Sequence, residues 1–430
     1  YSFNTRSPYL DANNVKLHYP EKIDQEATGY FEFKSVRHDS VRLSKYPKFI
    51  SYENNVHLSN LGDEHLKYVG GVAIEGKSFI GASMYGQESK IEYDDPDGKK
   101  FKVRSKLFNF QDTVISSYHS KVTVYQGRDS IFHPSVKTRF YTNTKRFVAI
   151  KDKNGFSVRP FEATYYNMSI DADMIDWDMN TDSLNISILN AKSMLPAYFK
   201  SGEYFDNEEI KELTGVYNFN PLLVVYSYGA KRKTREFYVT DLIDDLKLNE
   251  KAVRGAMEHL MYLDFIDYDE TGGRIYLKDK AIHFVRSKNN KKDYDDLLIP
   301  SLSVKKPNAT LYLDTEELTV RGIDKFFISE ILDVYIYPKN NEIKLLKNRD
   351  FVFDGQLFAG NFEFVGRNFT FRYDSFLVDL QNIDSVKFYV EGEGQYERKQ
   401  IDNKLVSLEM NENNAAGATE DHSTSGTLYI

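Results

Sequence analysis

The sharpest chemical pattern in the sequence lies between residues 71 and 78, where a G-x-x-x-x-G-K-S spacing is formed by Gly71, Gly76, Lys77 and Ser78. In a phosphate-binding loop, backbone amides hold the phosphates, the lysine contacts the β and γ phosphates, and the serine binds Mg²⁺ at the start of a helix. Here apolar residues alternate along the segment and two glycines follow it, which predicts a strand. Nucleotide binding is therefore an alternative hypothesis beside a chance match.

Two groups of aspartates offer the oxygen ligands that Ca²⁺ prefers. Neither group has the spacing of a helix–loop–helix calcium loop, and solvated carboxylates on a loop or strand face are the competing interpretation. The longer group contains Asp171, Asp173, Asp176 and Asp178, and the shorter one contains Asp94, Asp95 and Asp97.

Other catalytic chemistry has little support in the sequence. The nine histidines show no H-x-H or H-E-x-x-H spacing, and there is no G-x-S-x-G pattern. The absence of cysteine excludes disulfides, thiolate metal sites and cysteine nucleophiles. We predict no catalytic residue, no resident metal and no cofactor.

The composition indicates a globular protein rich in strands. The 430 residues include 31 Tyr and 30 Phe but one Trp, and such aromatic residues suit half-buried sheet surfaces. The formal net charge of −8 disfavours a nucleic acid partner, which requires a basic face. No apolar run is long enough to cross a bilayer, so we expect no transmembrane segment in this chain.

Two stretches alternate apolar and polar residues with the period of two that is typical of strands. Lys121–Gln126 and Val136–Tyr141 belong to the first stretch, and Phe362–Phe364 and Phe369–Tyr373 are predicted as separate short strands in the second. Asp94–Lys100, which is polar and contains proline, is expected to be an exposed loop. We predict a mainly β fold of the jelly-roll, sandwich or β-solenoid type.

Between these stretches the period changes and predicts a small α/β insertion. Thr240 is expected to cap a helix at Asp241–Leu246, and Asn249 a second helix with an apolar face. Phe265–Leu277 has two short apolar runs around Thr-Gly-Gly, which predicts a hairpin. This order of helix, helix and hairpin resembles a winged helix. We expect five segments: a partial β segment at 1–35, a β-rich domain at 36–191, the winged-helix-like insert at 192–287, a second β-rich domain at 288–400, and a polar tail at 401–430.

The second predicted helix of the insert raises the question of DNA binding. Lys251 and Arg254 would face phosphates or base edges if this helix entered a groove. Many aspartates and glutamates crowd the same region and would repel a duplex. We therefore interpret the insert as a packing or protein-contact module.

Seven phrases of the sequence are distinctive: Asn4–Pro8, Tyr68–Gly81, Asp129–Pro134, Arg235–Val239, Lys306–Thr310, Tyr337–Asn341 and Lys347–Gly355. Together they resemble a family of very large proteins from Bacteroidota, which typically carry an export signal. The resemblance implies an internal segment of an exported protein of the bacterial cell envelope, either periplasmic or exposed at the surface. Its implied partners are other envelope proteins, lipid or glycan. The strand-rich parts are also loosely similar to β-jellyroll proteins that carry lipid across the envelope.

Five Asp-Ser or Asp-Thr pairs followed by an apolar residue resemble the O-glycosylation acceptors of Bacteroidota envelope proteins. The competing interpretation is a turn that enters a strand, because Asp and Ser are favoured in turns. The acceptor candidates are Ser40, Thr113, Ser130, Ser183 and Ser385.

These observations favour a non-enzymatic structural or binding segment of a large envelope protein. A first alternative is lipid or glycan binding or transport through a β-jellyroll groove, which requires an apolar face that opposing side chains leave unfilled. A second alternative is a nucleotide-binding protein that uses the Gly71–Ser78 pattern.

Overall fold

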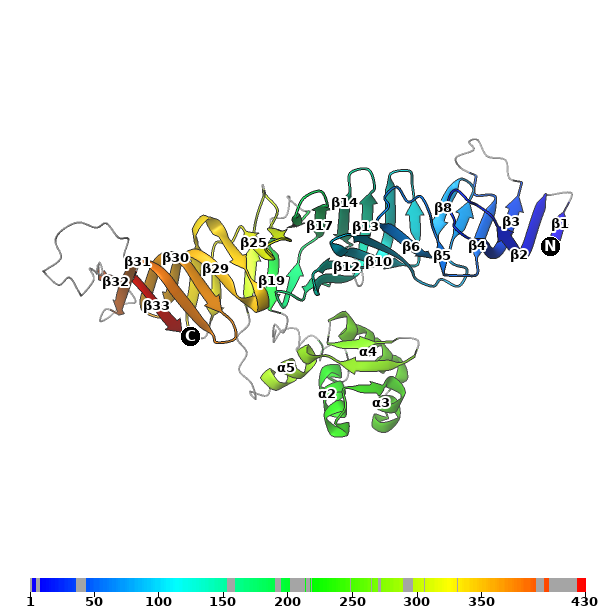
Figure 1. Ribbon diagram of the computed structural model, residues 1–430. Helices are drawn as coiled ribbons and strands as arrows, with labels where there is room; N and C mark the ends of the chain where they lie inside the picture. Colours follow the sequence, from blue (N-terminus) through cyan, green and yellow to red (C-terminus); the bar gives the residue numbers. More distant parts are fainter. Residues whose placement is uncertain are drawn as a thin grey trace. The chain divides into compact units, whose positions relative to one another are not determined.

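The computed structural model confirms a mainly β chain with a small winged-helix-like insertion (Figure 1). The large antiparallel sheet is open. The contacts divide the chain into unit 1 (Tyr1–Tyr165, Ala172–Ser193 and Pro307–Leu318) and unit 2 (Tyr166–Asp171, Met194–Lys306 and Thr319–Ile430). The structure describes residues 2–4, 8–35, 44–152, 159–189, 195–201, 213, 217, 219–247, 249–263, 265–269, 272–288, 297–304, 306–330, 332–391, 398–401 and 424–430.

Unit 1 is built from short strands whose turns contain glycine and polar residues. Its described strands are β1 (Ser2–Asn4), β2 (Tyr9–Leu17), β3 (Ala27–Lys34), β4 (Lys48–Ser51), β5 (Val56–His57), β6 (Leu66–Gly70), β7 (Ala73–Glu75), β8 (Ser78–Gly81), β9 (Ser89–Asp95), β10 (Gly98–Ser105), β11 (Phe108–Phe110), β12 (Val114–Gln126), β13 (Asp129–Tyr141), β14 (Arg146–Lys151), β15 (Phe161–Ala163), β17 (Met174–Asp178), β18 (Ser183–Ser187) and β24 (Ala309–Tyr312).

The long strand β12 of the β12–β13 hairpin pairs with two different strands besides β13 along its length. The pairing of β12 with β13 shifts register between Ser117 and Val122, where His119 has a φ of 54°. Before the shift β12 pairs with β11, and after it β12 pairs with β10. Such an irregularity bends a strand and increases its twist. The same hairpin therefore pairs with β11 on one side of the bend and with β10 on the other.

The turn between β9 and β10 corrects one prediction. Asp94–Lys100 was expected to be an exposed loop, but only Pro96 and Asp97, which are exposed, lie outside the strands, because β9 runs to Asp95 and β10 starts at Gly98 opposite it. Gly98 has a φ of 116°, a conformation that glycine adopts without strain. The Asp97 amide donates to Asp95 Oδ1 at 3.0 Å, and this hydrogen bond stabilises the tight turn between the two strands.

Unit 2 contains a second set of strands besides the insert. These are β16 (Met168–Asp171), β19 (Ala197–Ser201), β23 (Leu298–Ser301), β25 (Glu317–Arg321, whose first residues belong to unit 1), β26 (Phe326–Ser329), β27 (Val334–Pro338), β28 (Glu342–Leu345), β29 (Phe351–Ala359), β30 (Phe362–Arg372), β31 (Leu377–Glu391), β32 (Arg398–Ile401) and β33 (Thr424–Tyr429), with short 3₁₀ helices η3 (Lys339–Asn341) and η4 (Lys347–Arg349).

Two features of unit 2 differ from the sequence expectations. The two strands predicted around residues 362–373 are one strand, β30, because it pairs with β29 and β31 on both sides of the register shifts near Gly366. A side chain at Gly366 would meet Asn382 O at 2.2 Å, so glycine here allows close approach of the neighbouring strand. The end of the predicted polar tail forms β33, which pairs with β31.

The insert, described between Leu213 and Lys288, follows the order of a winged helix. It contains α2 (Pro221–Arg232), β20 (Glu236–Tyr238), α3 (Val239–Leu246), α4 (Glu250–Tyr262), β21 (Ile266–Tyr268), β22 (Arg274–Leu277) and α5 (Asp279–Lys288). The three strands form an antiparallel sheet in the order β20, β22, β21. The predicted hairpin is thus confirmed, and β20 joins it across β22.

Local signals and a separate core fix the helices of the insert. Asn249 caps α4 as predicted, since its side chain accepts from the Ala252 amide at 3.1 Å. The prediction for Thr240 is wrong, because α3 starts at Val239, directly where Tyr238 leaves β20. The apolar faces of the helices pack on the inner face of the sheet in one buried cluster that includes Leu222, Val225, Phe237, Leu242, Val253, Met257, Leu260, Phe265, Ile275 and Phe284.

Candidate functional site

The phosphate-loop pattern at 71–78 lies in a β-hairpin. β7 pairs with β8, and Gly76, with a φ of 59°, makes the turn with Lys77. Ser78 starts β8 rather than a helix. The Gly71 amide donates to Asn54 Oδ1 at 2.8 Å and is therefore already bonded. The segment lacks the strand, loop and helix arrangement that presents free amides to a phosphate.

The four aspartates predicted as calcium candidates have other partners or lie at separate strand ends. Asp176 accepts two hydrogen bonds from the Arg146 guanidinium, at 2.7 and 2.6 Å. Asp178 accepts from Asn180 Nδ2 at 2.9 Å. Within the described parts of the chain, no three His, Cys, Asp or Glu residues are grouped so that they could hold a metal ion. The other two candidates, at the end of β16 and just before β17, are Asp171 and Asp173.

The acceptor candidates for glycosylation occupy different structural settings. Thr113 is exposed in the turn before β12, whereas Ser130 and Ser183 are half-buried near the start of β13 and β18. Ser385 lies within β31, and Ser40 lies outside the described residues. Three of the pairs therefore stand where a turn enters a strand, and their modification stays a prediction.

The interior of unit 1 bears on the lipid-groove alternative, which requires unfilled apolar space. The rings of Phe101 and Phe147 stack with their centroids 4.4 Å apart, and Phe140 lies 5.4 Å from Phe101. The cavity among these rings and their apolar neighbours measures about 10 Å³, roughly the space of one water molecule. This part of unit 1 is a filled core with no room for an acyl chain.

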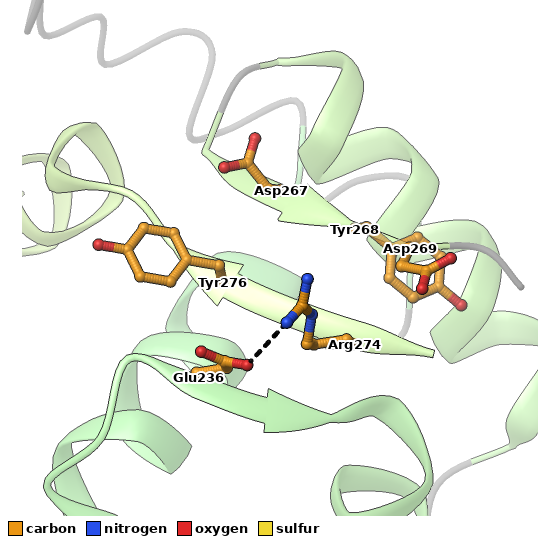
Figure 2. Close-up of a pocket in the computed structure, with 6 residues that line it drawn as sticks. All are labelled: Glu236, Asp267, Tyr268, Asp269, Arg274 and Tyr276. Atoms are coloured by element: carbon orange, nitrogen blue, oxygen red, sulfur yellow. Dashed lines mark hydrogen bonds and ion pairs between the residues drawn. The ribbon is translucent and has the colours of Figure 1, made fainter. Parts of the chain in front are cut away.

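A defined surface lies on the outer face of the insert's sheet. Glu236 of β20 lies opposite Tyr276 of the central strand β22, and Tyr276 lies opposite Asp267 of β21. In the next row Tyr238 lies opposite Arg274. Figure 2 shows the Tyr276 ring with Glu236 and Asp267 on the strands to either side. We call this surface the wing face; it comprises Glu236, Tyr238, Asp267, Asp269, Arg274 and Tyr276.

The period of two in the strands explains why these side chains face outward. Their neighbours Phe237 and Ile275 are buried in the insert's core, so the alternate positions must point to solvent. Tyr238 is 51% exposed and Tyr276 is 42% exposed. In the described part of the insert, these two tyrosines are the only large apolar side chains that are exposed.

The wing face is hollowed and carries more acidic than basic groups. The hollow measures about 390 Å³ and is lined by three carboxylates, the Arg274 guanidinium, Tyr276 and the largely buried Tyr268. Arg274 Nη1 lies 3.3 Å from Glu236 Oε1, and Lys278 Nζ lies 3.3 Å from Asp267 Oδ1 (Figure 2 draws the first pair). Both carboxylates are more than half exposed, and ion pairs at such sites contribute about 0–1 kcal/mol, so the carboxylates can exchange these cations for other partners.

The exposed side of α4 is less suited to DNA than its position in a winged helix suggests. Arg254 Nε donates to Glu250 at 2.9 Å and Nη1 donates to the Tyr268 hydroxyl at 3.3 Å. These hydrogen bonds, first that to Glu250, raise the pKa of Arg254 above its ordinary value. A hollow of about 570 Å³ along α4 is lined by Lys251 and Arg254 but also by Glu250 and Glu258. The charges balance, whereas a grip on phosphates needs a basic excess.

No protein-family model, curated protein or solved structure matches the chain in comparisons with known proteins. Among the helices of the described residues, none combines the length and apolar character that crossing a membrane requires.

Proposed function

We propose that this chain is a non-enzymatic binding segment of a large bacterial cell-envelope protein, in which β units carry the winged-helix-like insert and the insert contacts a protein partner. The envelope location rests on the family resemblance of the phrases quoted above. The binding role rests on one observation: the insert's exposed large apolar side chains, Tyr238 and Tyr276, lie on the same outer face of its sheet, and Tyr276 lines a hollow there. Tyrosine is enriched among the residues that carry binding energy at protein interfaces.

Two features support a binding role over a purely structural one. The insert has its own buried core, so its fold does not need the two tyrosines as packing. Exposed aromatic rings on a sheet lose favourable burial, and a partner that covers them recovers it at about 25 cal/mol per Å². Charge balance along α4, together with the acidic excess at the wing face, favours a protein over a nucleic acid.

The test is photo-crosslinking in the bacterial cells that make the protein. A photoreactive residue replaces Tyr276, and a matched variant carries it in place of Tyr118, which is 51% exposed on β12. We expect a light-dependent adduct with one protein at position 276 only, and saturable binding when that protein is purified and mixed with the full chain. Equal adducts at both positions, or a purified protein that does not bind, would refute the proposal.

A further inference from the structure

We propose that the wing face recognises an arginine side chain presented by an exposed segment of a protein partner. This inference rests on the proposed function and specifies the chemistry of the partner. It starts from the row across the three strands, in which Tyr276 of β22 lies opposite Glu236 of β20 on one side and Asp267 of β21 on the other. Residues directly opposite on an antiparallel pair have Cβ atoms about 4.5–5.5 Å apart.

This spacing suits a planar cation. A guanidinium that stacks on the Tyr276 ring lies within reach of both carboxylates and can donate to each through its separate N–H groups. An ammonium group has no planar surface to stack and is more strongly hydrated. The second tyrosine, Tyr238, lies diagonally from Tyr276 and extends the apolar surface for the stem of the incoming side chain.

The chain's own cations already show that these carboxylates attract positive charge. Arg274 contacts Glu236 from the same strand as Tyr276, but the two side chains are 60% and 55% exposed. Lys278 contacts Asp267, whose side chain is 66% exposed. Cations already lie over aromatic rings elsewhere in the insert, as the Arg232 guanidinium does over the Tyr228 ring, 4.9 Å from its centre. A third carboxylate at the hollow, Asp269, adds to the acidic excess.

Fluorescence anisotropy of the full chain tests this proposal. The probes are labelled peptides of alternating serine with arginine, lysine or glutamate, eight residues each, and a labelled DNA duplex. We expect saturable binding of the arginine peptide, weaker binding of the lysine peptide, and none of the glutamate peptide or the duplex. The double variant Glu236→Gln/Asp267→Asn should weaken arginine-peptide binding by about five- to tenfold, and Tyr276→Ala by about two- to fivefold.

Two further variants separate recognition from general charge and from misfolding. Glu64→Gln/Asp97→Asn removes the same amount of charge from unit 1 and should leave peptide binding unchanged. The two side chains are 88% and 85% exposed, respectively. Arg274→Gln frees Glu236 and should tighten binding, an outcome that misfolding does not produce. Equal weakening in both double variants, weaker binding by Arg274→Gln, or a preference for lysine, glutamate or DNA would overturn the proposal.

The two proposals fail in different ways. If the protein captured at position 276 binds the Glu236→Gln/Asp267→Asn chain as tightly as the unaltered chain, the arginine assignment is wrong and the binding role stands. If no protein is captured at position 276, the binding role is wrong whatever the peptides do.

Discussion

A glycine in the middle of α4 provides a sharp test of how the insert's helices are stabilised. Gly255 lies within α4, has no positive φ, and a Cβ added there would meet no atom within 4 Å. Glycine in a helix interior costs about 0.5–1 kcal/mol relative to alanine. Gly255→Ala should therefore stabilise α4, because nothing in the described structure requires glycine at this position.

Hydrogen exchange of the full chain measures this effect, since amide protection reports local opening. We expect the α4 amides to exchange about two- to fivefold more slowly in Gly255→Ala, which corresponds to about 0.5–1 kcal/mol. The matched control is Gly229→Ala in α2, where the new Cβ would lie 2.8 Å from Thr234 O. That variant should open more easily, by about 1–3 kcal/mol. Faster exchange in Gly255→Ala, or equal effects of the two variants, would refute the reasoning.

Three other predictions concern single contacts. Phe147→Ala removes a fully buried ring from the unit 1 stack and should lower the free energy of unfolding by about 3–5 kcal/mol in denaturant titrations. Hydrogen bonds from Arg232 and Tyr228 lower the pKa of Asp245. The ionised carboxylate therefore stabilises the fold at pH values above its ordinary pKa, and this stabilisation is lost as the pH falls through the lowered pKa. Arg232→Gln should raise the pKa of Asp245 in an NMR titration, and an unchanged pKa would contradict the contact. Lys325→Met removes the ammonium that lies 3.6 Å from the centre of the Tyr335 ring and should destabilise unit 2 by about 0.5–1 kcal/mol, seen as a lower thermal midpoint; an unchanged midpoint would count against this cation–π contact.

The strands were the most predictable feature because their period is read directly from the sequence. β12 and β13 contain the alternating runs that indicated them, and their inward residues are buried. The extent of strands was less predictable, as β30 shows. Phe362–Phe364 and Phe369–Tyr373 look like two strands because polar residues and Gly366 separate them, yet the ladder continues through a register shift. Long-range pairing decides such cases, and local sequence does not report it.

The insert was predictable in order but not in its boundaries. Asn249 capped α4 as predicted because a side-chain cap is a local interaction. β20 was missed, although it completes the sheet, because Glu236–Tyr238 is a strand of three residues whose partner β22 lies far along the chain. With β20 unseen, the start of α3 was misplaced by assigning the cap to Thr240.

The candidate site was missed for a related reason. Glu236-Phe-Tyr238 and Arg274-Ile-Tyr276 each alternate polar or aromatic positions around a buried residue, and this signal was present in the sequence. Only pairing in space shows that Tyr276 lies between two carboxylates. Conversely, the Gly71–Ser78 pattern matches the spacing of a phosphate-binding loop, but spacing alone does not specify that a helix follows. In this chain the strand β8 begins at Ser78 instead.

Crosslinking from the wing face tests the central claim most directly, because it asks whether a partner covers Tyr276 in the cell. The account predicts a light-dependent adduct with one protein from position 276, no such adduct from position 118, and saturable binding of the purified protein to the full chain. The absence of an adduct at position 276, or the same adducts at both positions, would contradict it.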